Sequence, residues 1–250
     1  MKKIVIGIFK GGNSKSTLSQ IIASGLKRKK QYKVLLVDLD QQHTLTDFLN
    51  ANPNGLGIIQ ALENPGRVKE CIQHTDRGDI IAGSEYFHVH SDYIKSLNAI
   101  NDMLAEVNDD YDIAIIDTPP AMSPITLSAT AAADHIIIPV RPDKVSINGM
   151  SLYGKSIREV CEATKKSPLV KVVITQANYR AKSVQAVDLA IETAAPIFNA
   201  KVYKTRLGFY TAYPDSQLLG KDIFEEFSGS KAVDQLNGLM DEIIVDIENA

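Results

Sequence analysis

The sequence predicts an α/β fold with a doubly wound, mostly parallel central sheet that is flanked by helices. Short apolar runs alternate with longer segments of helical period along the chain, and several runs are apolar at consecutive positions. Consecutive apolar residues are typical of strands that are buried on both faces, as they are in parallel sheets. The alternation of such strands with helices is the rhythm of a doubly wound sheet.

Each expected strand is a short run such as KIVIGI or DIAIID, and each expected helix repeats apolar residues at helical spacing. The strands are expected at 3–8, 33–38, 78–83, 112–117, 135–140, 169–175 and 200–205. The helices are expected at 16–30, roughly 55–74, 89–108, 124–133, 146–166, 183–195 and 230–248. The chain has 250 residues, 44% of them hydrophobic, and no visible linker or repeat, so we expect residues 1–250 to form a single domain.

Composition excludes several classes of protein. The formal net charge is -3, so no overall basic excess points to nucleic acid. Cys71 and Cys161 lie far apart without a C-x-x-C pattern, which argues against a metal site or a disulfide framework. The first apolar run is too short for a signal peptide, and no stretch approaches the length of a membrane span, so we expect a cytoplasmic protein that does not bind membranes.

A glycine-rich stretch, FKGGNSKST at 9–17, follows the first expected strand and opens the first expected helix. The usual P-loop pattern is G-x-x-x-x-G-K-[ST], but Phe9 and Ser14 stand where its two glycines would be. Backbone N–H groups at a helix start attract phosphate, Lys15 would reach the β- and γ-phosphates, and the Ser16 hydroxyl would ligate Mg²⁺. A plain turn between strand and helix is the alternative for this stretch taken alone.

Acidic residues at two other strand ends favour the nucleotide site. Asp38 and Asp40 follow the second strand in VLLVDLDQQ, and Asp117 ends the fourth in DIAIIDTPP. Ligands of doubly wound sheets bind at the carboxyl ends of the strands, so these acids should lie beside the glycine-rich stretch. Carboxylates there suit Mg²⁺ and a positioned water molecule.

Together these segments resemble the deviant Walker A ATPases, and within them the ParA-type partition ATPases, which are related to MinD. KGGNSKST at 10–17 matches the family's K-G-G-x-G-K-[ST]-[ST] loop except at Ser14, DLDQQ at 38–42 matches D-x-D-P-Q except at Gln41, and DTPP at 117–120 is intact. The resemblance implies a P-loop NTPase fold with ATP and Mg²⁺ as ligands. The nucleotide-binding residues it implies are Gly11, Gly12, Asn13, Ser14, Lys15, Ser16 and Thr17.

The resemblance also implies individual roles. Lys10 looks like the signature lysine that reaches the partner's phosphates in an ATP-bound dimer, Lys15 like the P-loop lysine, and Asp40 like the acid that positions the attacking water; these are the expected catalytic residues. Ser16 and Asp117 look like the Mg²⁺ ligands, Asp117 through water. The activity implied is slow, partner-stimulated ATP hydrolysis that drives plasmid or chromosome segregation.

Charge placement agrees with a DNA-binding partition ATPase. Residues 141–206 hold twelve basic and five acidic residues, a local surplus of +7. In ParA-type proteins the ATP-bound homodimer binds DNA without sequence preference through basic residues of this half, a centromere-binding adaptor is the usual partner, and the ATP-bound form associates with the nucleoid. The candidate DNA contacts, expected on exposed loops, are Arg180, Lys182, Lys204 and Arg206. Ordinary solvated helix faces are the alternative explanation of the surplus.

Relatives with other activities stay open as alternatives. The acidic final segment, 231–250, argues against a MinD-like membrane helix, and its apolar residues indicate a helix packed on the sheet. The cysteines do not suit a nitrogenase-type iron protein. An ATP-dependent metabolic enzyme, positioning of another cargo in the manner of MinD, and a binding-only module with an inactive loop are the alternatives kept. No extension precedes the first strand, so we expect the helix-turn-helix domain of longer partition ATPases to be absent.

Overall fold

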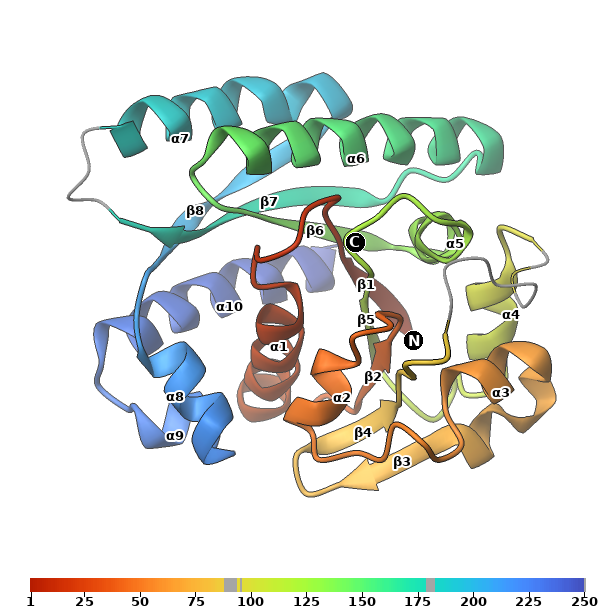
Figure 1. Cartoon of the computed structure of the whole chain (residues 1–250). Helices are drawn as coiled ribbons and strands as arrows, with labels where there is room; N and C mark the ends of the chain where they lie inside the picture. Colours follow the sequence, from red (N-terminus) through yellow and green to blue (C-terminus); the bar gives the residue numbers. More distant parts are fainter. Residues whose placement is uncertain (88–93, 95, 179–182, 250) are drawn as a thin grey trace.

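The computed structural model describes residues 1–87, 94, 96–178 and 183–249. In this part of the chain the centre of the fold is an eight-stranded sheet (Figure 1). Its strands are β1 (Lys2–Ile6), β2 (Val34–Asp38), β3 (Ile72–Thr75), β4 (Gly78–Ile81), β5 (Ile113–Asp117), β6 (His135–Val140), β7 (Leu169–Ala177) and β8 (Ala200–Gly208). The expected α/β class with a mostly parallel sheet is confirmed.

The strands lie in the order β3-β4-β2-β5-β1-β6-β7-β8, and every neighbouring pair is parallel except β3 and β4. β1 therefore sits in the middle, between β5 and β6. The carboxyl ends of β1, β2, β5 and β6 meet at one edge of the sheet, which is where doubly wound folds bind their ligands.

Helices cover both faces of the sheet (Figure 1). They are α1 (Lys15–Lys30), α2 (Thr44–Phe48), α3 (Ile58–Glu63), α4 (Ala99–Ala105), α5 (Pro124–Ala132), α6 (Lys144–Thr164), α7 (Ser183–Ala194), α8 (Ala212–Leu219), α9 (Ile223–Glu226), α10 (Lys231–Asn249) and the 3₁₀ turns η1 (Pro65–Cys71) and η2 (Ala195–Phe198). Successive β1 side chains point to opposite faces: Val5 joins the core beneath α4, α5 and α6, and Ile4 joins the core beneath α1 and α10. The acidic final segment thus packs on the sheet, as expected.

The largest difference from the expected elements lies at 55–74. In place of one long helix the chain forms α3, η1 and then β3, because Pro65 and Gly66 follow α3 and interrupt the helical pattern. β3 then turns back and pairs antiparallel with β4. The short helices α2, α8 and α9 were also not expected. Within the described residues, no helix is both long and apolar enough to cross a membrane.

Candidate nucleotide site

The loop between β1 and α1 packs against helix α6. A side chain at Gly7 would place its Cβ 2.7 Å from the Tyr153 ring, and one at Gly149 would come within 3.0 Å of the Phe9 carbonyl oxygen. The Phe9 ring packs on Tyr153 with 4.9 Å between ring centres. Phe9, which stands where the usual P-loop has its first glycine, therefore anchors the loop in the core and does not occupy the ligand side.

A buried asparagine fixes the centre of the loop. The Asn13 side chain is 1% exposed, and its amide nitrogen donates to the Lys10 carbonyl oxygen over 3.3 Å. Its amide oxygen accepts from the backbone N–H of Arg141 over 3.0 Å. Arg141 directly follows β6, so Asn13 joins the loop to the neighbouring strand end. Arg141 itself was not expected at the site, although it begins one of the segments that follow strand ends.

Ser14 adopts the backbone conformation that a glycine would adopt at its position. Its φ is 65° and its ψ is 29°, in the left-handed region, and it immediately precedes α1. A side chain in this region destabilises the backbone by about 1 kcal/mol or more relative to glycine. The serine therefore keeps a left-handed bend directly before the helix, and helix α1 begins at Lys15 with its free N–H groups directed at the loop.

The acids of β2 and β5 lie side by side at this edge. Asp38 and Asp117 are register partners at the ends of the two strands, and both are fully buried. One Asp117 oxygen, Oδ2, accepts from the Ser16 hydroxyl over 2.5 Å. Burial and the neighbouring Asp38 carboxylate raise the pKa of Asp117 to about 7, while the Lys15 ammonium and the Ser16 hydroxyl act in the opposite direction. Loop and strand end thus meet as expected.

The donor atoms around Asp117 fit a magnesium ion. The other carboxylate oxygen, Oδ1, is buried and has no hydrogen-bond partner in the described part of the chain. Among the described residues no three His, Cys, Asp or Glu side chains are grouped to hold a metal by themselves. Mg²⁺ prefers oxygen donors and usually shares its shell with substrate phosphates and water, so Ser16 and Asp117 suit it better than a dedicated cage would.

Asp38 and Asp40 have different surroundings. Asp38 accepts hydrogen bonds from the backbone N–H and the hydroxyl of Thr46, at 2.9 and 2.8 Å, and from the backbone N–H of Asp40. Burial raises the pKa of Asp38 to about 6, against the effect of these bonds. Asp40 is nearly buried, and its carboxylate accepts a hydrogen bond from the backbone N–H of Gln42 through Oδ1. Asp38 therefore holds α2 to the sheet, while Asp40 keeps acceptor capacity.

The remaining nucleotide-site residues lie around the loop. Lys15 is 7% exposed and contributes its charge at Asp117, whereas Lys10 is exposed to solvent. The Thr17 hydroxyl accepts from the Gln217 side chain of α8 over 3.0 Å. Gln217 was not expected at the site, since it is 200 residues away in sequence and no local pattern marks it.

The four expected DNA contacts have different outcomes. Arg180 and Lys182 lie outside the described residues. Lys204 is exposed on β8. Arg206 also lies within β8, and its guanidinium forms ion pairs with Glu192 at 2.5 Å and Asp188 at 4.0 Å. The expected loop position is wrong for both Lys204 and Arg206, because β8 continues to Gly208. The expected exposure is also wrong for Arg206, because acids of α7 cover its side chain.

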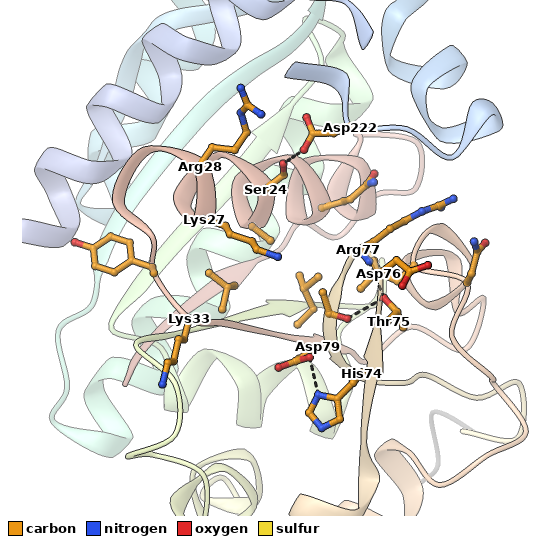
Figure 2. A pocket seen from close by; sticks show the side chains of 18 of the residues that line it. Ser24, Lys27, Arg28, Lys33, His74, Thr75, Asp76, Arg77, Asp79 and Asp222 are labelled. Atoms are coloured by element: carbon orange, nitrogen blue, oxygen red, sulfur yellow. Dashed lines mark hydrogen bonds and ion pairs between the residues drawn. The ribbon is translucent and has the colours of Figure 1, made fainter. Parts of the chain in front are cut away.

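A groove of about 1330 Å³ lies elsewhere, over the amino-terminal ends of β2 and β4 beside α1 (Figure 2). Figure 2 shows Lys27 of α1 over this groove, a hydrogen bond from Ser24 to Asp222, and a hydrogen bond between the His74 ring and the Asp79 carboxylate. Both signs of charge line the groove. None of the residues expected to bind nucleotide contributes to it.

Known proteins are similar to this chain in sequence. A family model described as an AAA domain matches residues 1–170. The virulence plasmid ParA family protein pGP5-D of Chlamydia psittaci is 28% identical, over 97% of this chain and 94% of that protein. The chromosome-partitioning ATPase Soj of Thermus thermophilus is 24% identical, over 100% of this chain and 98% of Soj.

Solved structures agree on the fold. Apo McdA from Cyanothece has a TM-score of 0.87 at 19% identity, over 98% of this chain and 99% of McdA. A plasmid partition protein from Borrelia burgdorferi, bound to AMPPNP, has a TM-score of 0.82 at 20% identity, over 98% of each chain. The fold and the loop define a P-loop ATPase. The chain belongs to the AAA domain family and, within it, to the ParA-type partition ATPases.

Proposed function

We propose that this chain is a partition ATPase that binds ATP at the loop after β1, hydrolyses it to ADP and phosphate, and drives plasmid or chromosome segregation. The observation that carries the proposal is the buried Asp117 carboxylate, which holds the Ser16 hydroxyl on one oxygen and, within the described residues, leaves the other without a partner. A buried, unpartnered carboxylate oxygen is unfavourable unless a cation binds beside it. Mg²⁺ bound together with ATP would supply that cation beside Asp117.

The roles of the residues follow from their places around the loop. Lys15 would contact the β- and γ-phosphates, Ser16 and Asp117 would hold Mg²⁺, and Thr17 would contact the α-phosphate. The backbone of the loop would face the phosphates at Gly11, Gly12, Asn13 and Ser14. Bound Mg²⁺ would neutralise charge on the phosphates. Asp40, with an acceptor oxygen to spare, would orient the attacking water. The names of two similar proteins, the Soj ATPase and the AMPPNP-bound Borrelia protein, support ATP as the nucleotide.

Dimerisation and DNA binding complete the proposal. Lys10 is exposed on the loop and could reach the phosphates of a second copy. Two copies would double the phosphate contacts of a weak basic surface, so DNA binding would depend on ATP. Of the candidate DNA contacts that lie within the described residues, Lys204 is exposed and could contact DNA phosphates directly. A centromere-binding adaptor would stimulate turnover, and the ATP-bound form would associate with the nucleoid.

Calorimetry with ATP and Mg²⁺ tests the central claim. The parent protein should bind, and Lys15→Ala should abolish the binding because the ammonium that faces the phosphates is lost. Turnover measured with and without duplex DNA then separates a partition ATPase from a metabolic relative, since DNA should change the rate for the partition ATPase alone. No heat from the parent protein at millimolar ATP contradicts the proposal.

A further inference from the structure

A glutamine of β7 bridges two residues of the phosphate-binding loop. The side-chain nitrogen of Gln176, Nε2, donates to the Ser14 hydroxyl oxygen over 2.7 Å and lies 3.3 Å from the carbonyl oxygen of Gly12. The two loop residues lie on either side of Asn13, which is itself bonded to the backbone of Arg141. The loop is therefore held from β7 as well as from the end of β6.

The backbone of β7 directs this side chain toward the loop. Gln176 has a φ of 53°, in the left-handed region, and the pairing of β7 with β8 shifts register between Ile174 and Ala177. A shift of this kind is a bulge, which turns one residue out of the regular alternation of side chains. An irregular backbone at Gln176 is uncommon for a residue that is not glycine, and its side chain bonds to the loop.

Ser14 gives the contact its significance. With glycine at position 14, as in the usual pattern, the loop would reach its left-handed conformation freely and offer no hydroxyl. With serine, the conformation is disfavoured, and the side chain makes no capping bond to the described helix α1. The bond that the Ser14 hydroxyl does make is to Gln176. The residue that strains the loop thus also supplies the atom by which β7 holds it.

We propose that Gln176 is a positioning residue that keeps the loop in its nucleotide-binding conformation, and that it acts through the Ser14 hydroxyl. The proposal rests on nucleotide binding at this loop. Without the amide, the loop of the free protein would leave the competent conformation part of the time, and the apparent Kd rises as the competent fraction falls. With glycine at position 14 the loop needs no such support.

The test compares four proteins: the parent, Gln176→Met, Ser14→Gly and the double variant. Methionine keeps the length of the side chain and removes the donor. In the serine background Gln176→Met should raise the Kd for Mg-ATP about fivefold, the effect of one ordinary hydrogen bond. In the glycine background the same change should raise it less than about twofold. Gln20→Met, a glutamine of α1 that lines the groove, serves as the matched control and should leave Kd unchanged.

Two further measurements separate positioning from a general structural role. In steady-state turnover KM for ATP should rise in Gln176→Met while kcat at saturating ATP stays the same, since bound nucleotide restores the loop. In the nucleotide-free protein, amide hydrogen exchange at residues 11–15 should be faster in Gln176→Met than in the parent. The difference between the two glycine-14 proteins should be much smaller, because only the longer bond to the Gly12 carbonyl oxygen is lost there.

The outcomes are distinct. If the parent protein binds no ATP, the proposed function fails, and the exchange measurement still decides whether Gln176 holds the loop. An equal change of Kd in the serine and glycine backgrounds overturns the coupling to Ser14. Unchanged exchange at residues 11–15 in Gln176→Met overturns the positioning role itself.

Discussion

Replacing Asp117 by asparagine should stabilise the protein in the absence of metal and nucleotide. The pKa of Asp117 is about 7, about three units above its ordinary value of 3.8, because the carboxylate is buried beside Asp38. Each unit corresponds to about 1.36 kcal/mol, so the ionised side chain lowers the free energy of unfolding by about 4 kcal/mol at pH 8. Asparagine removes that charge and loses about 1 kcal/mol through a weaker bond from Ser16.

The expected gain in the free energy of unfolding is therefore about 3 kcal/mol at pH 8. The sign follows from the direction of the shift: a carboxyl group whose pKa is raised on folding stabilises the protein below its unfolded pKa, and that stability is lost as pH rises through the folded pKa. At pH 5 the folded carboxyl group of Asp117 is already protonated. The gain from Asp117→Asn should fall there to about 1 kcal/mol or less.

Urea unfolding in EDTA at pH 8 and pH 5 measures both values. The exposed change Asp109→Asn is the control for removing one negative charge from the surface. Adding Mg-ATP should then stabilise the parent protein and leave Asp117→Asn unchanged, because a ligand stabilises only a folded state that binds it. A variant less stable than the parent at pH 8 in EDTA, or a gain that is the same at both pH values, would refute the reasoning.

Three other experiments test the proposed function and the fold. Lys10→Ala should bind ATP and fail to form the ATP-dependent dimer, whereas Asp40→Ala should bind ATP and persist as a dimer; light scattering decides, and normal dimerisation of Lys10→Ala contradicts its role. Lys204→Ala should weaken binding to any duplex and reduce the log–log salt slope by about 0.9 for each DNA phosphate that the side chain neutralises in the parent protein. The effect of Arg206→Ala should be smaller, because acids neutralise Arg206. Fluorescence anisotropy on two unrelated duplexes compares the two variants, and an effect that depends on the DNA sequence counts against these DNA contacts. Burial lowers the pKa of His135 to about 4, against the opposing effect of Asp246, so the stability that neutral His135 contributes is present above pH 6.5 and is lost as pH falls. In denaturant titrations the free energy of unfolding should fall between pH 7 and pH 5 by about 2 kcal/mol more in the parent than in His135→Gln. Equal falls in the two proteins would show that His135 is not the cause.

The sequence predicts strands best where burial makes them continuous apolar runs. Ile113–Asp117 and His135–Val140 are buried throughout and were predicted to within a residue. β3 has no fully buried residue, so its sequence carries no such run. It exists because β4 offers an edge for pairing. The five-residue helix α2 likewise depends on the bonds from Thr46 to Asp38, which a local pattern cannot reveal.

Some residues of the site could be predicted from local patterns in the sequence, and others could not. Asp117 and Ser16 were predicted because strand-end acids and the loop motif are local signals, and the structure places them in contact. Gln176 directly follows an expected strand, so the strand-end rule includes it, but a lone glutamine there carries no chemical signature. Its importance comes from the bulge in β7, and that of Gln217 from the hydrogen bond by which α8 reaches α1. Both are tertiary features.

The hydrogen bonds of Asp38 have a consequence for comparing relatives of this chain. Its oxygens accept hydrogen bonds from Thr46 and from the Asp40 backbone, so the first acid of the Asp-x-Asp segment connects β2 to α2. An asparagine could keep some of these hydrogen bonds, and we expect evolution to tolerate such an exchange at position 38 sooner than at position 40. A loss of turnover after mutating Asp38 would therefore report a displaced helix, and should not by itself be taken as evidence that this carboxylate takes part in hydrolysis.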